Sequence, residues 1–181
     1  MIIETIPNPA WYIYWGNCTC MGKMPDVNWK PTRAWCERVI HAMDSTIELF
    51  DLYIFDDDCR GDISAHIVRA TKGHPRFVVQ SRRPDLVGKE REPLDKISGL
   101  FLTKISPYGL IEMARQRLCD TASMVDRHWM HKVIEELKKQ DDIFLQTLSD
   151  FLVPDCVYRG NVCHKPKSKC CRLSKHYSEL Y

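Results

Sequence analysis

Apolar and polar positions alternate at two different spacings in the first half of the chain. An apolar stripe at helical spacing follows Thr32, a good N-cap, and predicts a helix within 30–43. The run 47–55 (IELFDLYIF) is rich in β-branched and aromatic residues and predicts a buried strand. The segment 56–62 (DDDCRGD) then breaks the pattern, and its aspartates Asp56, Asp57 and Asp58 favour a solvated turn over a cation site. A short helix is predicted to follow, over 62–70.

The second half of the chain is predicted to be helical. Ser106 and Pro107 form an N-cap and first-turn pair, and Asp120 and Asp141 are candidate N-caps for two further helices. The three helices are expected over about 107–118, 121–139 and 142–153. Strand and helix patterns of this kind predict an α/β fold.

Three further segments complete the pattern. Residues 76–80 (RFVVQ) predict a short strand, and the polar segment 84–98 predicts a mobile surface loop. The first thirty residues, rich in Trp and Tyr, predict irregular structure. We therefore expect one domain over residues 1–155 and a basic, Cys-rich tail over 156–181.

Composition narrows the class of protein. The chain has 181 residues, 44% of them hydrophobic, and a net charge of +2. It is apolar enough to form a core, and its overall charge gives no reason to expect nucleic-acid binding. No apolar run is long enough to cross a membrane, and the N-terminus lacks the features of a signal peptide. These features predict a cytoplasmic protein in a reducing compartment.

Cysteine is frequent, with nine residues in the chain. In a reducing compartment, clustered cysteines suggest thiols or metal ligands before disulfides. The tail supplies a candidate zinc site in Cys156, Cys163, Cys170 and Cys171, although the spacing matches no standard zinc motif. Structural zinc, free thiols and disulfides all remain open for the tail.

Residues 66–85 (HIVRATKGHPRFVVQSRRPD) concentrate positive charge around a Gly and two Pro residues. Arginine suits phosphate because its planar guanidinium donates two parallel hydrogen bonds. A solvated basic loop, a nucleic-acid patch and an anion-binding loop all fit this composition. A second basic site lies near the end of the 107–118 helix, where Arg117 is predicted on the semi-buried side and needs an anionic partner or a ligand.

These segments together resemble the flavin-dependent thymidylate synthases over about residues 30–171. The segment VRAT stands where that family has an Arg-His-Arg motif, and VVQSRRP stands where it has a Ser-x-Arg-Tyr loop. RLCDTASMVDRHW resembles its RLC-x-x-Ala-Gln-Trp-Glu-Ile helix start, and STIELFDLYIF resembles its strand near a Ser/Thr-x-x-Glu-His motif. The resemblance implies a mixed α/β domain with an antiparallel sheet and a helical C-terminal half.

The resemblance also implies a function. Such an enzyme methylates dUMP reductively, or modifies C5 of a related pyrimidine deoxynucleotide, using FAD with NADPH and methylenetetrahydrofolate as co-substrates. It implies a homotetramer whose active sites are shared between subunits. Arg69 and Ser81 correspond to catalytic positions. The substrate-binding positions would be His66, Arg69, Gln80, Ser81, Arg82, Arg83 and Arg117. The FAD-binding positions would be Thr46, Glu48, Arg69, Thr71, His74, Arg76, Ser106, Glu112 and Thr121.

The sequence departs from the family pattern in the Arg-His-Arg motif. Ala70 and Thr71 replace its second and third residues, and Pro84 replaces the closing Tyr of the loop. We expect Lys72, His74 and Arg76 to restore part of the lost charge. Two alternatives remain, namely a nucleotide-binding protein without flavin and catalysis, and a small basic nucleic-acid-binding protein.

Overall fold

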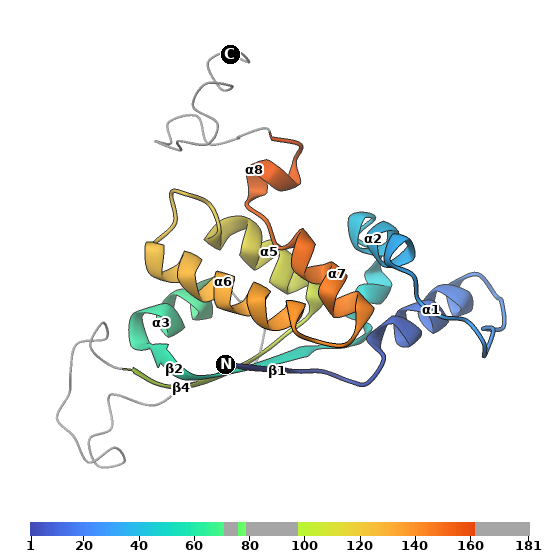
Figure 1. Ribbon diagram of the computed structural model, residues 1–181, viewed down its shortest axis with the longest axis horizontal. Helices are drawn as coiled ribbons and strands as arrows, with labels where there is room; N and C mark the ends of the chain where they lie inside the picture. The colour runs from blue at the N-terminus through green and yellow to red at the C-terminus, as the bar shows by residue number, and fades with distance from the viewer. Residues whose placement is uncertain (71–75, 79–97, 162–181) are drawn as a thin grey trace.

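The computed structural model describes residues 1–70, 76–78 and 98–161 (Figure 1). The strands are β1 (Ile2–Glu4), β2 (Leu52–Arg60), β3 (Arg76–Val78) and β4 (Ser98–Ile105). The helices are α1 (Pro9–Cys20), α2 (Arg33–His41), α3 (Gly61–Ala70), α5 (Pro107–Arg117), α6 (Met124–Lys138), α7 (Ile143–Phe151) and α8 (Asp155–Tyr158), and η1 (Ser45–Leu49) is a 3₁₀ helix. The predicted mixed α/β class is confirmed.

The strands form one antiparallel sheet in the order β1-β2-β4-β3. Ile54 at its centre lies opposite Ile3 of β1 and Thr103 of β4, and all three side chains are buried. Figure 1 shows α3, α5, α6 and α7 gathered over one face of this sheet. Side chains alternate between faces along a strand, so the residues next to these three point to the uncovered face.

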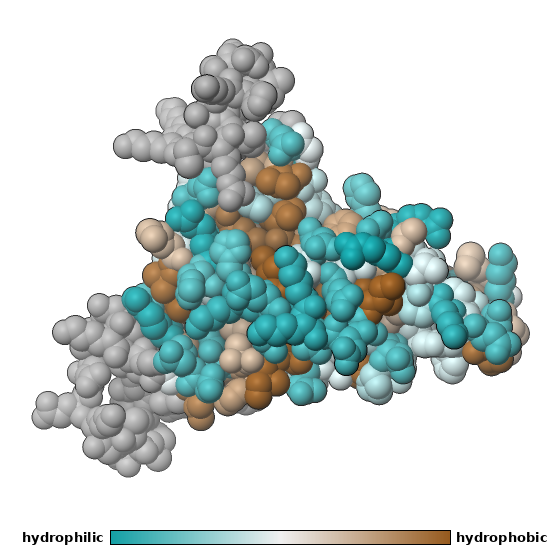
Figure 2. Space-filling view, viewed as in Figure 1, coloured by the Kyte–Doolittle hydropathy of each residue, from teal (hydrophilic) through white to brown (hydrophobic). Residues whose placement is uncertain are grey.

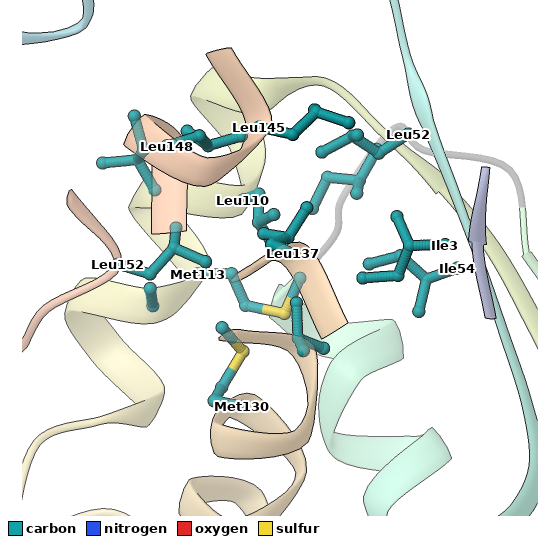
Figure 3. Packing of buried hydrophobic residues seen from close by; sticks show 14 of the residues in the cluster. Ile3, Leu52, Ile54, Leu110, Met113, Met130, Leu137, Leu145, Leu148 and Leu152 are labelled. Atoms are coloured by element: carbon teal, nitrogen blue, oxygen red, sulfur yellow. The ribbon is translucent and has the colours of Figure 1, made fainter. Parts of the chain in front are cut away.

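The hydrophobic core lies between the sheet and these helices. Figure 3 shows Ile3 and Ile54 from the sheet facing a group of helical Leu and Met side chains. Trp129 of α6 packs edge-on against Phe101 of β4, with ring centroids 6.2 Å apart. Figure 2 shows hydrophilic residues spread over the middle of the face that carries α6, as expected for an amphipathic helix with one side in the core.

Two of the predicted helix N-caps are confirmed, and two are displaced. Thr32 accepts a hydrogen bond from the Trp35 N–H, and Ser106 accepts one from the Gly109 N–H. The N-cap of α6 is Ser123 instead of Asp120, and the N-cap of α7 is Asp142 instead of its neighbour Asp141.

The predicted strand over 47–55 is wrong at both ends. Residues 47–49 belong to η1, which Asp44 caps by accepting from the Thr46 N–H. The strand β2 then continues through the aspartates that were predicted to form a solvated turn. It does so because the first of them, Asp56, is buried and accepts a hydrogen bond from Trp129 Nε1 at 2.9 Å. The outward-facing Asp57 forms an ion pair with the N-terminal ammonium group.

The predicted irregular structure of the first thirty residues is also wrong, because α1 occupies residues 9–20. Aromatic side chains hold this helix. Tyr14 stacks on Trp29 with ring centroids 4.1 Å apart, and Trp29 meets Trp35 of α2 edge-on at 4.7 Å. Trp11 packs edge-on against Trp29 as well. The cluster thereby joins α1, the following loop and α2.

Candidate functional site

Two residues that the family resemblance assigns to the substrate, His66 and Arg117, lie together in the structure. Asp126 joins them. Its Oδ1 lies 3.0 Å from His66 Nδ1, and its Oδ2 accepts a hydrogen bond of 3.1 Å from a terminal nitrogen of Arg117. The other terminal nitrogen of Arg117 donates to the backbone carbonyl oxygen of His66 at 3.0 Å. This cluster of His66, Arg117 and Asp126 connects α3, α5 and α6.

Local sequence places Arg117 and Asp126, two of the three members of the cluster. Ser106 and Pro107 start α5, which ends at Arg117, so a cation stands at the negative end of the helix dipole. Ser123 caps α6, and Asp126 lies in its first turn, where a carboxylate is favoured. The short connection between the two helices therefore brings opposite charges into contact.

The three side chains of the cluster differ in burial, and two of their charges compensate each other. The Asp126 side chain is 2% exposed, that of Arg117 is 23% exposed and that of His66 is 36% exposed. A buried carboxylate is stable only when it is paired, and Asp126 has two donors. Its negative charge balances the positive charge of Arg117. The Nε atom of Arg117 is buried without a hydrogen-bond partner among the described residues.

The remaining substrate-binding predictions are Arg69, Gln80, Ser81, Arg82 and Arg83. Arg69 stands three positions after His66 in the helical backbone of α3. The predicted positions Gln80, Ser81, Arg82 and Arg83 lie outside the described residues. The arrangement of these arginines around the cluster therefore stays a prediction.

Among the predicted FAD-binding residues whose side chains are described, Thr46, Ser106 and Glu112 make their contacts with residues outside this cluster. Thr46, in η1, donates from Oγ1 to Asp44 at 2.8 Å, and Ser106 caps the far end of α5 from Arg117. Glu112 forms an ion pair with Arg115. Two further predicted FAD-binding residues, Glu48 in η1 and Thr121, are exposed. The hydroxyl of Thr121 lies 3.1 Å from Cys119 Sγ. Thr71 and His74 lie outside the described residues, and Arg76 belongs to β3.

This distribution bears on whether FAD fits. The hydroxyls of Thr46 and Ser106 and the carboxylate of Glu112 already have protein partners. The described part of a single chain therefore does not present these groups as a prepared flavin site. Any such site would require the segments beyond the described ranges or a second subunit, as the resemblance implies.

A second charged cluster lies between α5 and α8. Arg115 pairs with Glu112 and, at 2.6 Å, with Asp155, and its guanidinium lies 4.6 Å from the centre of the Tyr158 ring. Burial raises the pKa of Asp155, but hydrogen bonds from Arg115 and Arg159 outweigh burial and leave the pKa below its usual value. The two arginines, Arg115 and Arg159, balance the charges of Glu112 and Asp155. We therefore interpret this cluster as the contact that attaches α8 to α5.

The predicted zinc site is described only in part. Cys156 is buried in α8, and Cys163, Cys170 and Cys171 lie outside the described residues. Within residues 1–70, 76–78 and 98–161, no group of three or more potential ligands surrounds a possible metal position. Zinc in the tail stays a prediction, which metal analysis of the purified protein tests.

Sequence reasoning did not identify Asp126. Its only local signal is its position three residues after Ser123, which is typical of a helix start. Its two partners are nine and sixty positions away, so no local pattern reveals them. A predicted semi-buried Arg117 required an anionic partner, and Asp126 is that partner.

No family model matches the chain, and no curated protein matches it. Among the described residues, no helix is long and apolar enough to cross a membrane.

Proposed function

We propose that this protein binds a pyrimidine deoxynucleotide beside the cluster of His66, Arg117 and Asp126. The enzyme function we propose is that of a flavin-dependent thymidylate synthase, with reductive methylation of dUMP or a related C5 modification. The observation that carries the proposal is the contact between His66 and Arg117 through Asp126. Both residues correspond to substrate positions, although 51 positions separate them.

The position of Arg69 supports the same pocket. It follows His66 by three residues on α3, and the chain continues from this helix toward Ser81 and Arg83. Arginines from this segment would supply the net positive charge that the cluster lacks, because Asp126 already balances Arg117. A nucleotide phosphate would then be bound by Arg69 and the following arginines, with His66 and Arg117 at its edge.

A second candidate function is nucleotide binding without flavin. The internal hydrogen bonds of Thr46 and Ser106, and the ion pair of Glu112, favour this candidate because they engage three of the predicted FAD contacts. The two candidates differ in one observable property. A flavoprotein is yellow when purified, whereas a flavin-free binding protein is colourless.

Calorimetric titrations with dUMP, dCMP and FAD test both candidates. The proposed enzyme binds dUMP and FAD, and the flavin-free candidate binds a pyrimidine nucleotide alone. Binding of none of the three would refute both. Steeply salt-dependent binding of DNA or RNA in their place would favour the nucleic-acid alternative.

We also propose that the chain forms a homo-oligomer through the uncovered face of its sheet. Ile2, Tyr53 and Leu100 on this face are 51%, 46% and 54% exposed. Phe55 and Leu102 are paired across β2 and β4 and are partly exposed beside them. Apolar residues grouped on an open sheet face are typical of an interface. Light scattering on the wild type and on a Tyr53→Lys, Leu100→Lys double variant tests this interface. We expect an oligomeric wild type and a variant of lower mass, and a monomeric wild type would contradict the proposal.

A further inference from the structure

We propose that an aromatic pocket on α1 binds a proline-rich segment of a partner protein. The residues that line this aromatic pocket are Pro7, Asn8, Trp11, Tyr12 and Trp15. Its volume is about 240 Å³. Figure 1 shows α1 at one end of the molecule, away from α3, α5 and α6. The aromatic pocket is therefore separate from the candidate site, and the inference does not depend on the proposed nucleotide binding.

One stripe of α1 forms the pocket wall. Asn8, Trp11, Tyr12 and Trp15 follow one another at spacings of three, one and three residues, which places them on one side of the helix. Ile13, on the opposite side, is buried in the core. Tyr12 and Trp15 are 46% and 52% exposed, so the stripe is open to solvent.

The charge and size of the pocket favour an uncharged segment of a larger partner. The sequence contains no Asp, Glu, Lys or Arg from Thr5 to Gly22. A membrane surface is a poor match, because helices that lie on anionic lipid carry Lys and Arg beside their apolar face. The volume is below the range of about 300–1,000 Å³ that is usual for sites enclosing a whole small ligand. It suits a few residues of a peptide.

Hydrogen-bond donors at the pocket are unpaired. Within the described part of the chain, the side chains of Asn8, Trp11, Tyr12 and Trp15 form no hydrogen bond, and Asn8 does not cap α1. An indole only donates, and a phenol hydroxyl or an amide can donate as well. Such a set matches a ligand rich in carbonyl oxygens. A proline-rich segment offers them, because proline lacks an N–H and the polyproline II helix has no internal hydrogen bonds.

The length of the stripe fits the same ligand. A helix rises about 1.5 Å per residue, so Asn8 and Trp15 are about 10 Å apart along α1. One turn of a polyproline II helix contains three residues and covers about 9 Å. Aromatic-lined grooves are a common way of recognising such segments, because the flat proline rings pack against the aromatic side chains.

The position of Trp11 is fixed without a ligand. Its ring meets Trp29 edge-on at a centroid distance of 5.8 Å, and Tyr14 edge-on at 5.9 Å. The rings of Trp11 and Trp15 are 6.1 Å apart with an interplanar angle of 83°, so they form a corner. A wall that is already ordered does not lose further side-chain entropy on binding, which favours affinity.

Fluorescence anisotropy of a labelled decaproline peptide measures the binding. We expect saturable binding to the wild type, and none of a labelled Gly-Ser peptide of equal length. Trp15→Ala removes an exposed aromatic anchor and should weaken binding at least about tenfold.

A conservative pair of variants tests the donors. Tyr12→Phe keeps the ring and removes one hydroxyl, so it should weaken decaproline binding about threefold to tenfold. Tyr108→Phe, the matched control, removes a hydroxyl from an exposed tyrosine of α5 outside the pocket and should bind as the wild type does. Circular dichroism establishes that all variants are folded.

The indole N–H resonances locate the peptide in a heteronuclear NMR spectrum. The chain has five tryptophans, and each gives one such resonance. Binding should shift the resonance of Trp15, which is assigned by its loss in Trp15→Phe. The resonance of Trp129 should stay in place, because its N–H is buried and bonded to Asp56.

Three results would overturn the inference. The first is the absence of saturable decaproline binding at millimolar peptide, and the second is binding that Trp15→Ala leaves unchanged. The third is tighter binding of choline or of a neutral oligosaccharide than of decaproline, because the pocket would then take a different class of ligand. None of these results bears on the proposed function, which dUMP binding tests separately.

Discussion

The indole Nε1–H of Trp129 donates a hydrogen bond of 2.9 Å to the carboxylate of Asp56, and both side chains are almost completely buried. The bond links α6 to β2 across 73 positions of sequence. Trp129 also lies one helical turn after Asp126. The face of α6 that contacts β2 through Trp129 therefore also carries Asp126 of the candidate site. The stability of α6 and the geometry of the site are therefore connected.

Replacement of Trp129 by Phe should destabilise the fold by about 2–4 kcal/mol, since it leaves a buried carboxylate with one donor fewer and shrinks a core side chain. Urea unfolding followed by circular dichroism measures the loss. The double variant Trp129→Phe, Asp56→Leu removes both partners and should lose at least about 1 kcal/mol less than the sum of the single losses. Strictly additive losses would show that the bond contributes nothing.

Asp126→Asn should lower the free energy of unfolding by about 3 kcal/mol, because it leaves Arg117 partly buried without a counter-charge. The matched control is Asp120→Asn, which affects the more exposed ion pair between Asp120 and Arg127 on the same helix connection. Its loss should be about 1 kcal/mol or less. Equal losses in the two variants would contradict a special role for Asp126.

The contribution of Asp155 should depend on pH. Its pKa in the folded protein is below the value of 3.8 for an unperturbed Asp, since Arg115 and Arg159 outweigh the effect of burial. A lowered pKa stabilises the fold above pH 3.8, and this stabilisation is lost as the pH falls through the folded-state pKa.

Asp155→Asn should accordingly destabilise the protein by about 1 kcal/mol at pH 7, a value limited by solvent screening at this partly exposed site. The difference from wild type should close as the pH falls through the lowered folded-state pKa of Asp155. Asp141→Asn, at an exposed position before α7, should have no comparable effect at either pH. A difference that persists unchanged into acid would contradict the ion-pair explanation.

Cysteine reactivity should distinguish Cys20 from Cys36. Burial, together with the negative charge of Asp142, raises the pKa of the Cys36 thiol to about 11, whereas Cys20 is exposed at the end of α1. The thiolate is the reactive form, so iodoacetamide at pH 7.5 should modify Cys20 much faster than Cys36. Peptide mass spectrometry measures both rates. Equal rates in native protein would contradict the burial of Cys36, and in urea the rates should converge.

Local patterns predicted the elements whose signals are local. The caps Thr32 and Ser106, the Pro107 position and the apolar stripe of α7 each depend on residues within one or two turns. Propensity and capping act over this distance, so α2, α5 and α7 were predicted with boundaries close to those observed.

The errors arose in elements whose structure depends on contacts between residues far apart in the sequence. The aspartates of β2 read as a turn because the partner of Asp56, Trp129, is far away in sequence. Helix α1 was missed because its aromatic side chains Trp11 and Tyr14 pack against Trp29, a contact outside the helix that no periodicity within the helix reveals. The candidate site shows the same limit, since His66 and Arg117 were predicted from motifs, and Asp126 emerged only from the structure.

Hydrogen–deuterium exchange with and without saturating dUMP tests the central claim, a nucleotide pocket at His66, Arg117 and Asp126, most directly. We predict slower exchange in the peptides covering α3 and the connection from α5 to α6, with little change in α1 and α2 because they are remote from the cluster. Unchanged exchange in α3 and in that connection, or protection confined to α1 and α2, would contradict the proposed pocket.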